Sequence, residues 1–88
     1  MHGYLYILQS AKDKSFYIGS AEDLDRRFFQ HNNGLVRSTK GKRPLELKFY
    51  KKYDNIADAR RAEYKLKSFK SRKILQLIVN DQNLQLEI

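Results

Sequence analysis

Residues 4–8 (YLYIL) and residues 15–18 (SFYI) decide how this chain folds. Both segments are rich in aromatic and β-branched residues, and a polar segment separates them, which predicts a β-hairpin. A four-residue loop over residues 10–13 would place Tyr6 directly opposite Tyr17. Because side chains alternate along a strand, the odd-numbered residues of the first strand should point to one face and the even-numbered ones to the other.

The segment after the hairpin predicts a helix. Ser20 and Asp23 match the two ends of a capping box, with Ser20 as the N-cap and Asp23 reaching back to it. The helix should run to about Asn32 and end at Gly34. The polar and basic residues 35–42 that follow predict a loop.

A third strand is expected over residues 45–53. Its alternation places Leu45, Leu47 and Phe49 on one side. Residues 84–88 also alternate between apolar and polar types, which predicts a short edge strand near the C-terminus.

Two more helices are expected in the second half of the chain, over residues 56–69 and 72–79. The expected N-caps are Asp54 or Asn55 for the first and Ser71 for the second. The order β-β-α-β-α-α indicates an α+β fold, with a three-stranded antiparallel sheet flanked by helices. At 88 residues the chain should form one domain, over residues 1–88.

Composition excludes several classes of protein. The chain is 41% hydrophobic with 11 aromatic residues, so it can build a core and should not be disordered. The absence of cysteine excludes disulfides, thiolate catalysis and cysteine-based zinc sites. No segment predicts a membrane span or a signal peptide, so the expected compartment is the cytoplasm and no membrane partner is expected.

The positive charge is concentrated in the middle of the chain. The net charge is +8, and residues 37–73 alone hold 14 Lys or Arg against four acids. A concentrated positive surface on a small domain attracts polyanions, and nucleic acid is the first candidate. The alternative is a charged surface that maintains solubility.

Three charged or ionisable residues fall on helix faces that should be apolar. Arg27 and His31 share an arc of the first helix with Leu24 and Phe28. Glu63 falls inside the apolar arc of the second helix, where a carboxylate is costly unless it is paired or bound to a metal.

The order of these residues resembles a known signature. Residues 4–6 (YLY), ten further residues and residues 17–19 (YIG) resemble the motif of the GIY-YIG nuclease family. Arg27 follows eight positions after the YIG glycine, as in that family, and His31 follows one helical turn later. Glu63 is similar to the family's metal-binding glutamate. The resemblance covers roughly residues 3–79 and is nearest to the small stand-alone bacterial members.

The sequence departs from the family pattern at two places. Tyr4 stands where the first triplet of the family has glycine, and Gly3 immediately precedes it. Asn80 is a candidate equivalent of the polar residue that the family often places after its glutamate.

The resemblance implies hydrolysis of phosphodiester bonds with one divalent cation, Mg²⁺ or Mn²⁺, held by Glu63. Arg27 would stabilise charge on the phosphoryl oxygens. Tyr6 and Tyr17 would hold the attacking water, and one of them would act as general base if nearby positive charge lowered its pKa. His31 would be a proton relay, a phosphate contact or an orienting group.

Each of these residues also has a purely structural interpretation. Tyr6 and Tyr17 could be core aromatics of the hairpin, and Arg27 could pair with Asp23 four positions before it. His31 could be an ordinary helix-end residue, and Glu63 could pair with a neighbouring lysine.

The leading expectation is a magnesium-dependent endonuclease that acts on DNA by structure rather than sequence, in DNA repair or recombination. Seven basic residues are expected to bind the nucleic acid: Arg37, Lys40, Lys42, Arg43, Arg60, Lys67 and Lys70. The alternative is a non-catalytic nucleic-acid-binding module, in which Tyr50, Tyr53 and Tyr64 stack on bases of DNA or RNA. A third interpretation is a helper that docks on a larger repair complex through residues 84–88.

Overall fold

Three antiparallel strands form the central sheet of the computed structural model, which describes residues 2–84. β1 (Gly3–Ser10) lies between β2 (Phe16–Ala21) and β3 (Leu45–Tyr53). Both β2 and β3 are therefore edge strands, and β2 is the one that carries the second half of the tyrosine motif.

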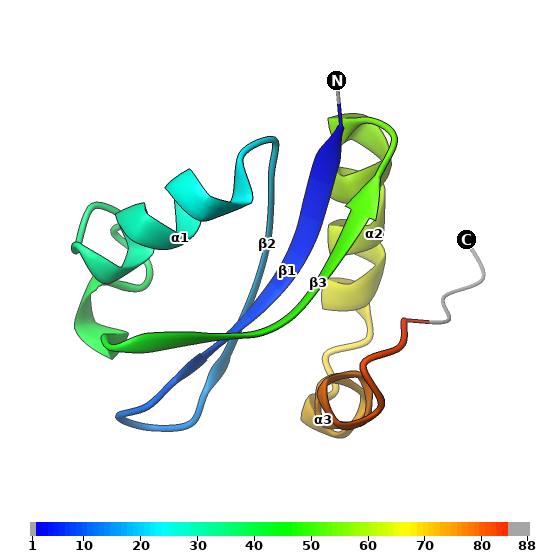
Figure 1. Cartoon of the computed structure of the whole chain (residues 1–88). Helices are drawn as coiled ribbons and strands as arrows, with labels where there is room; N and C mark the ends of the chain where they lie inside the picture. Colours follow the sequence, from blue (N-terminus) through cyan, green and yellow to red (C-terminus); the bar gives the residue numbers. More distant parts are fainter. Residues whose placement is uncertain (1, 85–88) are drawn as a thin grey trace.

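Helices lie on both faces of the sheet, as Figure 1 shows for α1 and α2. The helices are α1 (Leu24–Asn32), α2 (Ile56–Ser68) and α3 (Arg72–Asp81), and a short 3₁₀ turn, η1 (Lys40–Lys42), precedes β3. This order confirms the predicted α+β fold with a three-stranded antiparallel sheet flanked by helices.

The alternation predicted for the first strand is confirmed by the two cores. Leu5 and Ile7 point to the face covered by α2 and α3, where they pack with residues such as Leu66. Tyr6 and Leu8 point to the opposite face, in the cluster that contains Leu24 of α1. The candidate functional tyrosines therefore share a layer with α1.

The predicted register of the hairpin is wrong by two residues. Tyr6 pairs with Gly19, and Tyr17 pairs with Leu8. The loop begins one residue later than predicted, because Ser10 N donates to Ser15 O and these two residues flank a four-residue loop over residues 11–14. A shift of two residues leaves every side chain on its predicted face, so the tyrosines become diagonal neighbours instead of direct partners.

The prediction that Leu45, Leu47 and Phe49 share one side of β3 is also wrong. A β-bulge lies in the pairing between β1 and β3: Ile7 pairs with Phe49, whereas Leu8 pairs with Leu47. The extra residue reverses the alternation, so the two leucines pack with the α1 layer and Phe49 packs with the α2 layer.

Two of the helix starts are as predicted and one is not. Asn55 and Ser71 cap α2 and α3. The N-cap of α1 is Asp23, whose carboxylate accepts a hydrogen bond from Arg26 N, and Ser20 still belongs to β2. The strand continues past the point where the capping-box pattern suggested a helix.

The C-terminal ends of the first and third helices differ in how well they match the prediction. α1 ends at Asn32, as predicted, and Gly34 follows with a φ of 74°. α3 runs two residues beyond the predicted Val79. Leu84 packs into the α2 layer, and residues 85–88, where an edge strand and a docking segment were expected, lie outside the described residues.

Within residues 2–84, none of the helices combines the length and the apolar character needed to cross a membrane.

Candidate active site

The hydroxyl of Tyr6 is buried against the backbone of β2. Tyr6 is 1% exposed, and its Oη lies 3.0 Å from Nε2 of His31. Gly19 makes this placement possible, because a Cβ there would lie 2.4 Å from the Cζ and Oη atoms of Tyr6. The YIG glycine therefore provides space for the phenol of the first strand.

His31 continues a chain of buried hydrogen bonds that reaches the loop after α1. Its Nδ1 lies 2.7 Å from Oγ1 of Thr39, and this hydroxyl is 3.5 Å from the carbonyl oxygen of Val36. If Thr39 donates to Val36 O, it must accept from His31 Nδ1–H, and His31 Nε2 then accepts from the Tyr6 hydroxyl. This direction follows from matching donors to acceptors along the chain.

Tyr17 and Arg27 complete this side of the site. The Tyr17 ring is half-buried, with its centroid 6.5 Å from that of Tyr6 and 5.0 Å from that of His31. Arg27 Nη1 donates to Oε1 of Gln30 at 3.1 Å. Among the described residues Arg27 makes no salt bridge with Asp23, so that structural alternative is wrong.

Burial controls the protonation of the Tyr6 phenol and the His31 imidazole. It raises the pKa of Tyr6 to about 12, although Arg27 acts in the opposite direction. Burial, with a smaller contribution from the Arg27 charge, lowers the pKa of His31 to about 4. The expected lowering of the Tyr6 pKa by Arg27 is present but is outweighed by burial. Tyr6 is therefore a neutral phenol, and His31 a neutral imidazole, at neutral pH.

Glu63 contacts β2 from the face of the sheet opposite to Tyr6. It projects from α2, and its carboxylate accepts hydrogen bonds from Ser20 Oγ at 2.5 Å and from Lys67 Nζ at 2.6 Å. Ser20 is the neighbour of Gly19, against which the Tyr6 phenol lies. The negative charge of Glu63 is close enough to contribute to the raised pKa of Tyr6. The phenol and the carboxylate thus approach adjacent residues of one edge strand.

The donor set at Glu63 suits a cation that keeps most of its water. Among residues 2–84 no three His, Asp or Glu side chains gather to form a metal site, so Glu63 would act as a single carboxylate ligand. Mg²⁺ accepts such a site because it retains several waters. The ammonium of Lys67 already stands where a cation is attracted, and its side chain is 50% exposed and can move aside. The residues therefore fit a hydrated divalent cation.

Three polar residues of this site are not among those that the sequence indicates. Thr39 lies in a loop without periodicity, so its contact with His31 leaves no trace in the spacing. Ser20 has a spacing to Asp23 that points to a helix cap instead of a carboxylate contact. Gln30 gives a weak signal, since it lies three positions after Arg27 on one helix.

The predicted nucleic-acid-binding residues do not form one cluster. Lys67 contacts Glu63, and Lys70 follows in the turn after α2 with a φ of 49°. Lys42 pairs with Asp13 at 3.2 Å, and Arg43 Nε donates to Lys40 O. The remaining two, Arg37 and Arg60, are exposed, and Asn80 is exposed on α3 and accepts a hydrogen bond from Gln76.

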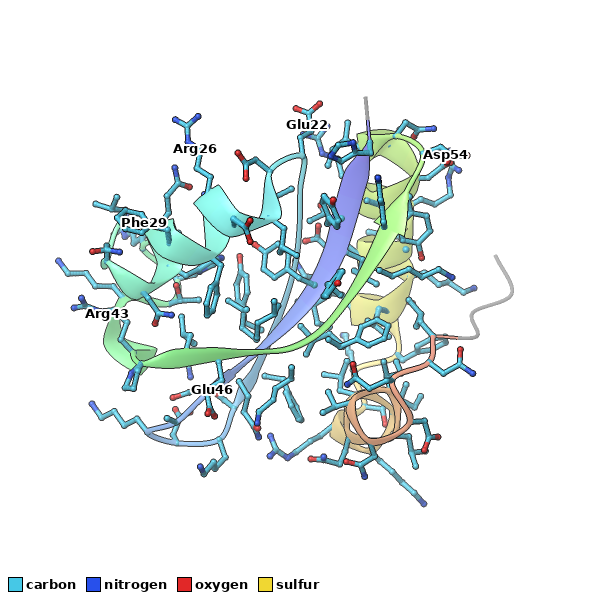
Figure 2. All side chains as sticks on the ribbon, viewed as in Figure 1. Glu22, Arg26, Phe29, Arg43, Glu46 and Asp54 are labelled. Atoms are coloured by element: carbon cyan, nitrogen blue, oxygen red, sulfur yellow. The ribbon has the colours of Figure 1, made fainter. Side chains whose placement is uncertain are left out.

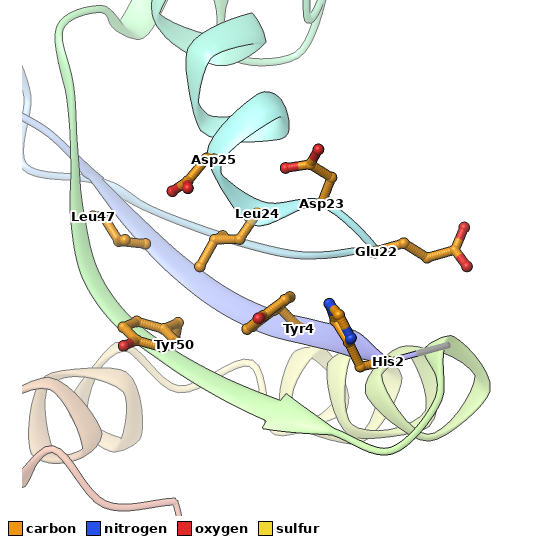
Figure 3. A pocket seen from close by; sticks show the side chains of 8 residues that line it. All are labelled: His2, Tyr4, Glu22, Asp23, Leu24, Asp25, Leu47 and Tyr50. Carbon is orange, nitrogen blue, oxygen red and sulfur yellow. The ribbon is translucent and has the colours of Figure 1, made fainter.

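A cavity of about 440 Å³ lies beside this site and has different chemistry. It opens between β1, β3 and the start of α1, and its lining residues are His2, Tyr4, Glu22, Asp23, Leu24, Asp25, Leu47 and Tyr50 (Figure 3). Its described lining includes three carboxylates and no lysine or arginine. A phosphate would be repelled there, so this cavity does not suit a nucleic-acid backbone.

A tyrosine pair, an arginine and a glutamate around the edge of a small α+β sheet define the catalytic-domain class of one nuclease family. Residues 2–75 match the family described as "GIY-YIG catalytic domain", and the chain belongs to the GIY-YIG family.

The similar proteins are small and bacterial. A UPF0213 protein of Staphylococcus saprophyticus is 40% identical over 76 residues, which cover 85% of this chain and 92% of the relative. A UPF0213 protein of Clostridium perfringens is 34% identical over 90 residues, which cover 97% and 96%. The solution NMR structure of a UPF0213 protein from Bacillus halodurans has a TM-score of 0.55 at 37% identity, covering 89% of this chain and 83% of that one.

Gly19→Ala tests the close approach of the Tyr6 phenol. The added methyl group would overlap the ring, and the Tyr6–His31 bond leaves the ring little freedom to move. We expect a loss of about 1–3 kcal/mol in the free energy of unfolding, measured by urea denaturation. Gly41→Ala is the matched control, because no atom would lie within 4 Å of a methyl group there and the change should stay within about 0.5 kcal/mol. Equal effects of the two variants would contradict this role of Gly19.

The lowered pKa of His31 predicts acid sensitivity in a defined pH range. Because the unfolded imidazole binds its proton near pH 6.5 and the folded one near 4, stability should be complete above 6.5 and fall as the pH drops toward 4. The loss should reach up to about 3 kcal/mol. His31→Asn should show a smaller loss over that range in the same unfolding series. An imidazole that titrates above pH 6 by NMR would contradict the prediction.

Proposed function

We propose that this protein is a divalent-metal-dependent endonuclease that hydrolyses phosphodiester bonds in DNA, selecting its substrate by structure rather than sequence. The observation that carries the proposal is the meeting of two groups of side chains at Gly19 and Ser20 of β2. Tyr6 and its partners approach this point from the α1 layer, and Glu63 approaches it from the α2 layer. Membership of the GIY-YIG family supports the same reaction class.

Arg27 and Tyr17 would act on the substrate directly. Arg27 is half-buried and permanently charged, so it can donate to the non-bridging oxygens as their charge increases in the transition state. Tyr17 is the more accessible of the two phenols, whereas Tyr6 is almost completely covered. We therefore assign the orientation of the attacking water to Tyr17.

The buried chain of hydrogen bonds would carry the proton of that water once bound substrate places the water against Tyr6 Oη, which is covered in the free protein. Tyr6 Oη can accept a proton while passing its own proton to Nε2 of His31, so that the phenol stays neutral and the imidazole becomes the cation. In the free protein burial and, to a smaller extent, the Arg27 charge oppose this transfer, because both lower the pKa of His31. A phosphate bound at Arg27 would neutralise that charge and make His31 a stronger base.

Glu63, beside Ser20, is the residue that would hold the divalent cation. The cation would supply Lewis-acid stabilisation of the phosphoryl and leaving oxygens when it is bound. Lys67 would have to leave the carboxylate, and its ammonium would then be available to a nearby phosphate.

The DNA preference rests on charge, since the net charge is +8 and seven basic residues are candidate phosphate contacts. Contacts to phosphate position a nucleic acid without reading its bases, which favours selection by shape. DNA repair or recombination is the setting that we propose for such an activity.

A non-catalytic nucleic-acid-binding module is the second candidate function. Both carboxylate oxygens of Glu63 have protein partners, as in a purely structural ion pair. Tyr50 and Tyr64 are 56% and 79% exposed and could stack on unpaired bases of DNA or RNA.

Cleavage of branched, flapped and nicked DNA in the presence of Mg²⁺ tests the proposal. We expect Glu63→Gln to reduce the single-turnover rate by about 100-fold or more, because it removes the charge that would hold the cation. Glu46→Gln is the control, since Glu46 is an exposed carboxylate whose one salt-bridge partner within residues 2–84 is Lys48, at 3.7 Å. Binding without cleavage by the wild-type protein, or equal cleavage by both variants, would favour the non-catalytic module.

Thr39 should influence the rate through His31 without contacting the substrate. Thr39→Val removes the acceptor for His31 Nδ1–H, whereas Thr39→Ser retains it. We expect the valine variant to lose about tenfold in kcat with little change in KM, and the serine variant to recover most of it. Imidazole ¹⁵N shifts should show a changed tautomer only in the valine variant. A rate loss with an unchanged tautomer would contradict this positioning role.

A further inference from the structure

A second cavity, of about 280 Å³, lies where β2 begins and α2 gives way to α3. Its floor is apolar, with Ile18, Leu66 and Leu75. Its rim carries Lys67, Lys70 and Arg72 together with the hydroxyls of Ser15 and Ser71, and no carboxylate is among its described lining residues. The cavity therefore combines three positive charges with two hydroxyl groups.

Arg72 is held in a defined direction at this rim. Its guanidinium carbon lies 4.7 Å from the centroid of the Phe16 ring, a cation–π arrangement that restricts the side chain. A restricted guanidinium loses less conformational entropy when it binds a phosphate and can donate two parallel hydrogen bonds to it. The ring of Phe16 is thus a support for an anion-binding group.

The cavity adjoins the candidate active site through one side chain. Lys67 lines the cavity, and its Nζ lies 2.6 Å from Oε2 of Glu63. Lys42 of the basic loop reaches the other end, because its Nζ lies 3.0 Å from Oγ of Ser15. Basic side chains therefore lie at both ends of the cavity, where Lys42 is paired with Asp13 and Lys67 with Glu63.

The residues that line the two cavities carry opposite charges, and this difference would direct the path of a bound strand across the surface. The 440 Å³ cavity on the α1 layer carries three carboxylates, whereas the 280 Å³ cavity on the α2 layer carries three cations. A polyanionic strand that has one phosphate at Arg27 and Glu63 would be repelled from the former and attracted to the latter.

We infer that the cavity rimmed by Lys67, Lys70 and Arg72 binds a backbone phosphate of the nucleic-acid strand that is cleaved, next to the reacting phosphate. The inference rests on the proposed function, because that function identifies the strand as the substrate. A small cavity with a single phosphate-binding rim suits a strand that is unpaired at this point. The preferred substrate is therefore one with a single-stranded segment beside the cleavage position.

The inference can be tested without turnover by measuring the binding of a labelled oligothymidylate by fluorescence anisotropy in EDTA. We expect Lys70→Gln combined with Arg72→Gln to weaken the Kd about tenfold or more. The slope of log K against log salt should decrease by about 0.7 for each phosphate that the variant no longer neutralises. Lys51→Gln combined with Lys52→Gln removes the same charge from β3 and should change the Kd by less than about twofold. Equal weakening by the two double variants would overturn the inference, because it would indicate only a general charge effect.

Two further measurements separate the possible outcomes. Amide NMR shifts at Ser71 and Arg72 should respond to the oligonucleotide far below the concentration of inorganic phosphate that has the same effect. An equal response would indicate a small-anion site and overturn the strand assignment. Cleavage by the wild-type protein with unchanged kinetics in the Lys70→Gln, Arg72→Gln variant would overturn the inference and leave the proposed function intact. Loss of binding in that variant, without cleavage by the wild-type protein, would support the cavity and refute the nuclease.

Discussion

The site depends on how closely groups from two layers can approach one edge strand. At Gly19 the strand has no side chain, so the phenol of Tyr6 lies directly against its backbone, and at the next residue Ser20 holds the carboxylate of Glu63. A sheet normally separates its two faces by the side chains of both. Here the edge position of β2 and the missing Cβ bring a buried, hydrogen-bonded phenol and a carboxylate to adjacent residues of one strand.

The sequence predicts the faces of the sheet better than it predicts the pairing of its strands. Alternation in β1 places Leu5 and Tyr6 on the correct layers, because that pattern depends only on local geometry. Pairing also depends on where the hairpin loop begins, and a shift of two residues has no effect on burial. The bulge opposite Ile7 and Leu8 has no signal in the apolar pattern of β3, and it moves Phe49 to the other core.

The candidate site is predictable to the extent that its residues share a helix or a motif. Helical spacing places Arg27 and His31 on one arc, and the apolar arc of α2 identifies Glu63. Thr39 is not predictable, because it is brought to His31 by the path of a loop. The pKa of Tyr6 is raised because burial outweighs the effect of Arg27, and sequence shows which charges are near but not how completely a phenol is covered. Exposed groups such as Arg26 and Phe29 point away from the sheet in Figure 2 and lie outside the site.

The hydrogen bond between Thr39 and His31 has a consequence for how this surface could change over evolutionary time. Thr39 is flanked in sequence by the basic residues at 37, 40, 42 and 43, so the loop that presents these charges also carries the partner of the imidazole. An insertion that lengthened the loop to reach a different ligand would displace the hydroxyl that sets the tautomer. A change in the ligand that the loop binds would therefore also change the chemistry at His31. The opposite edge of the sheet, at β3, can change without this effect.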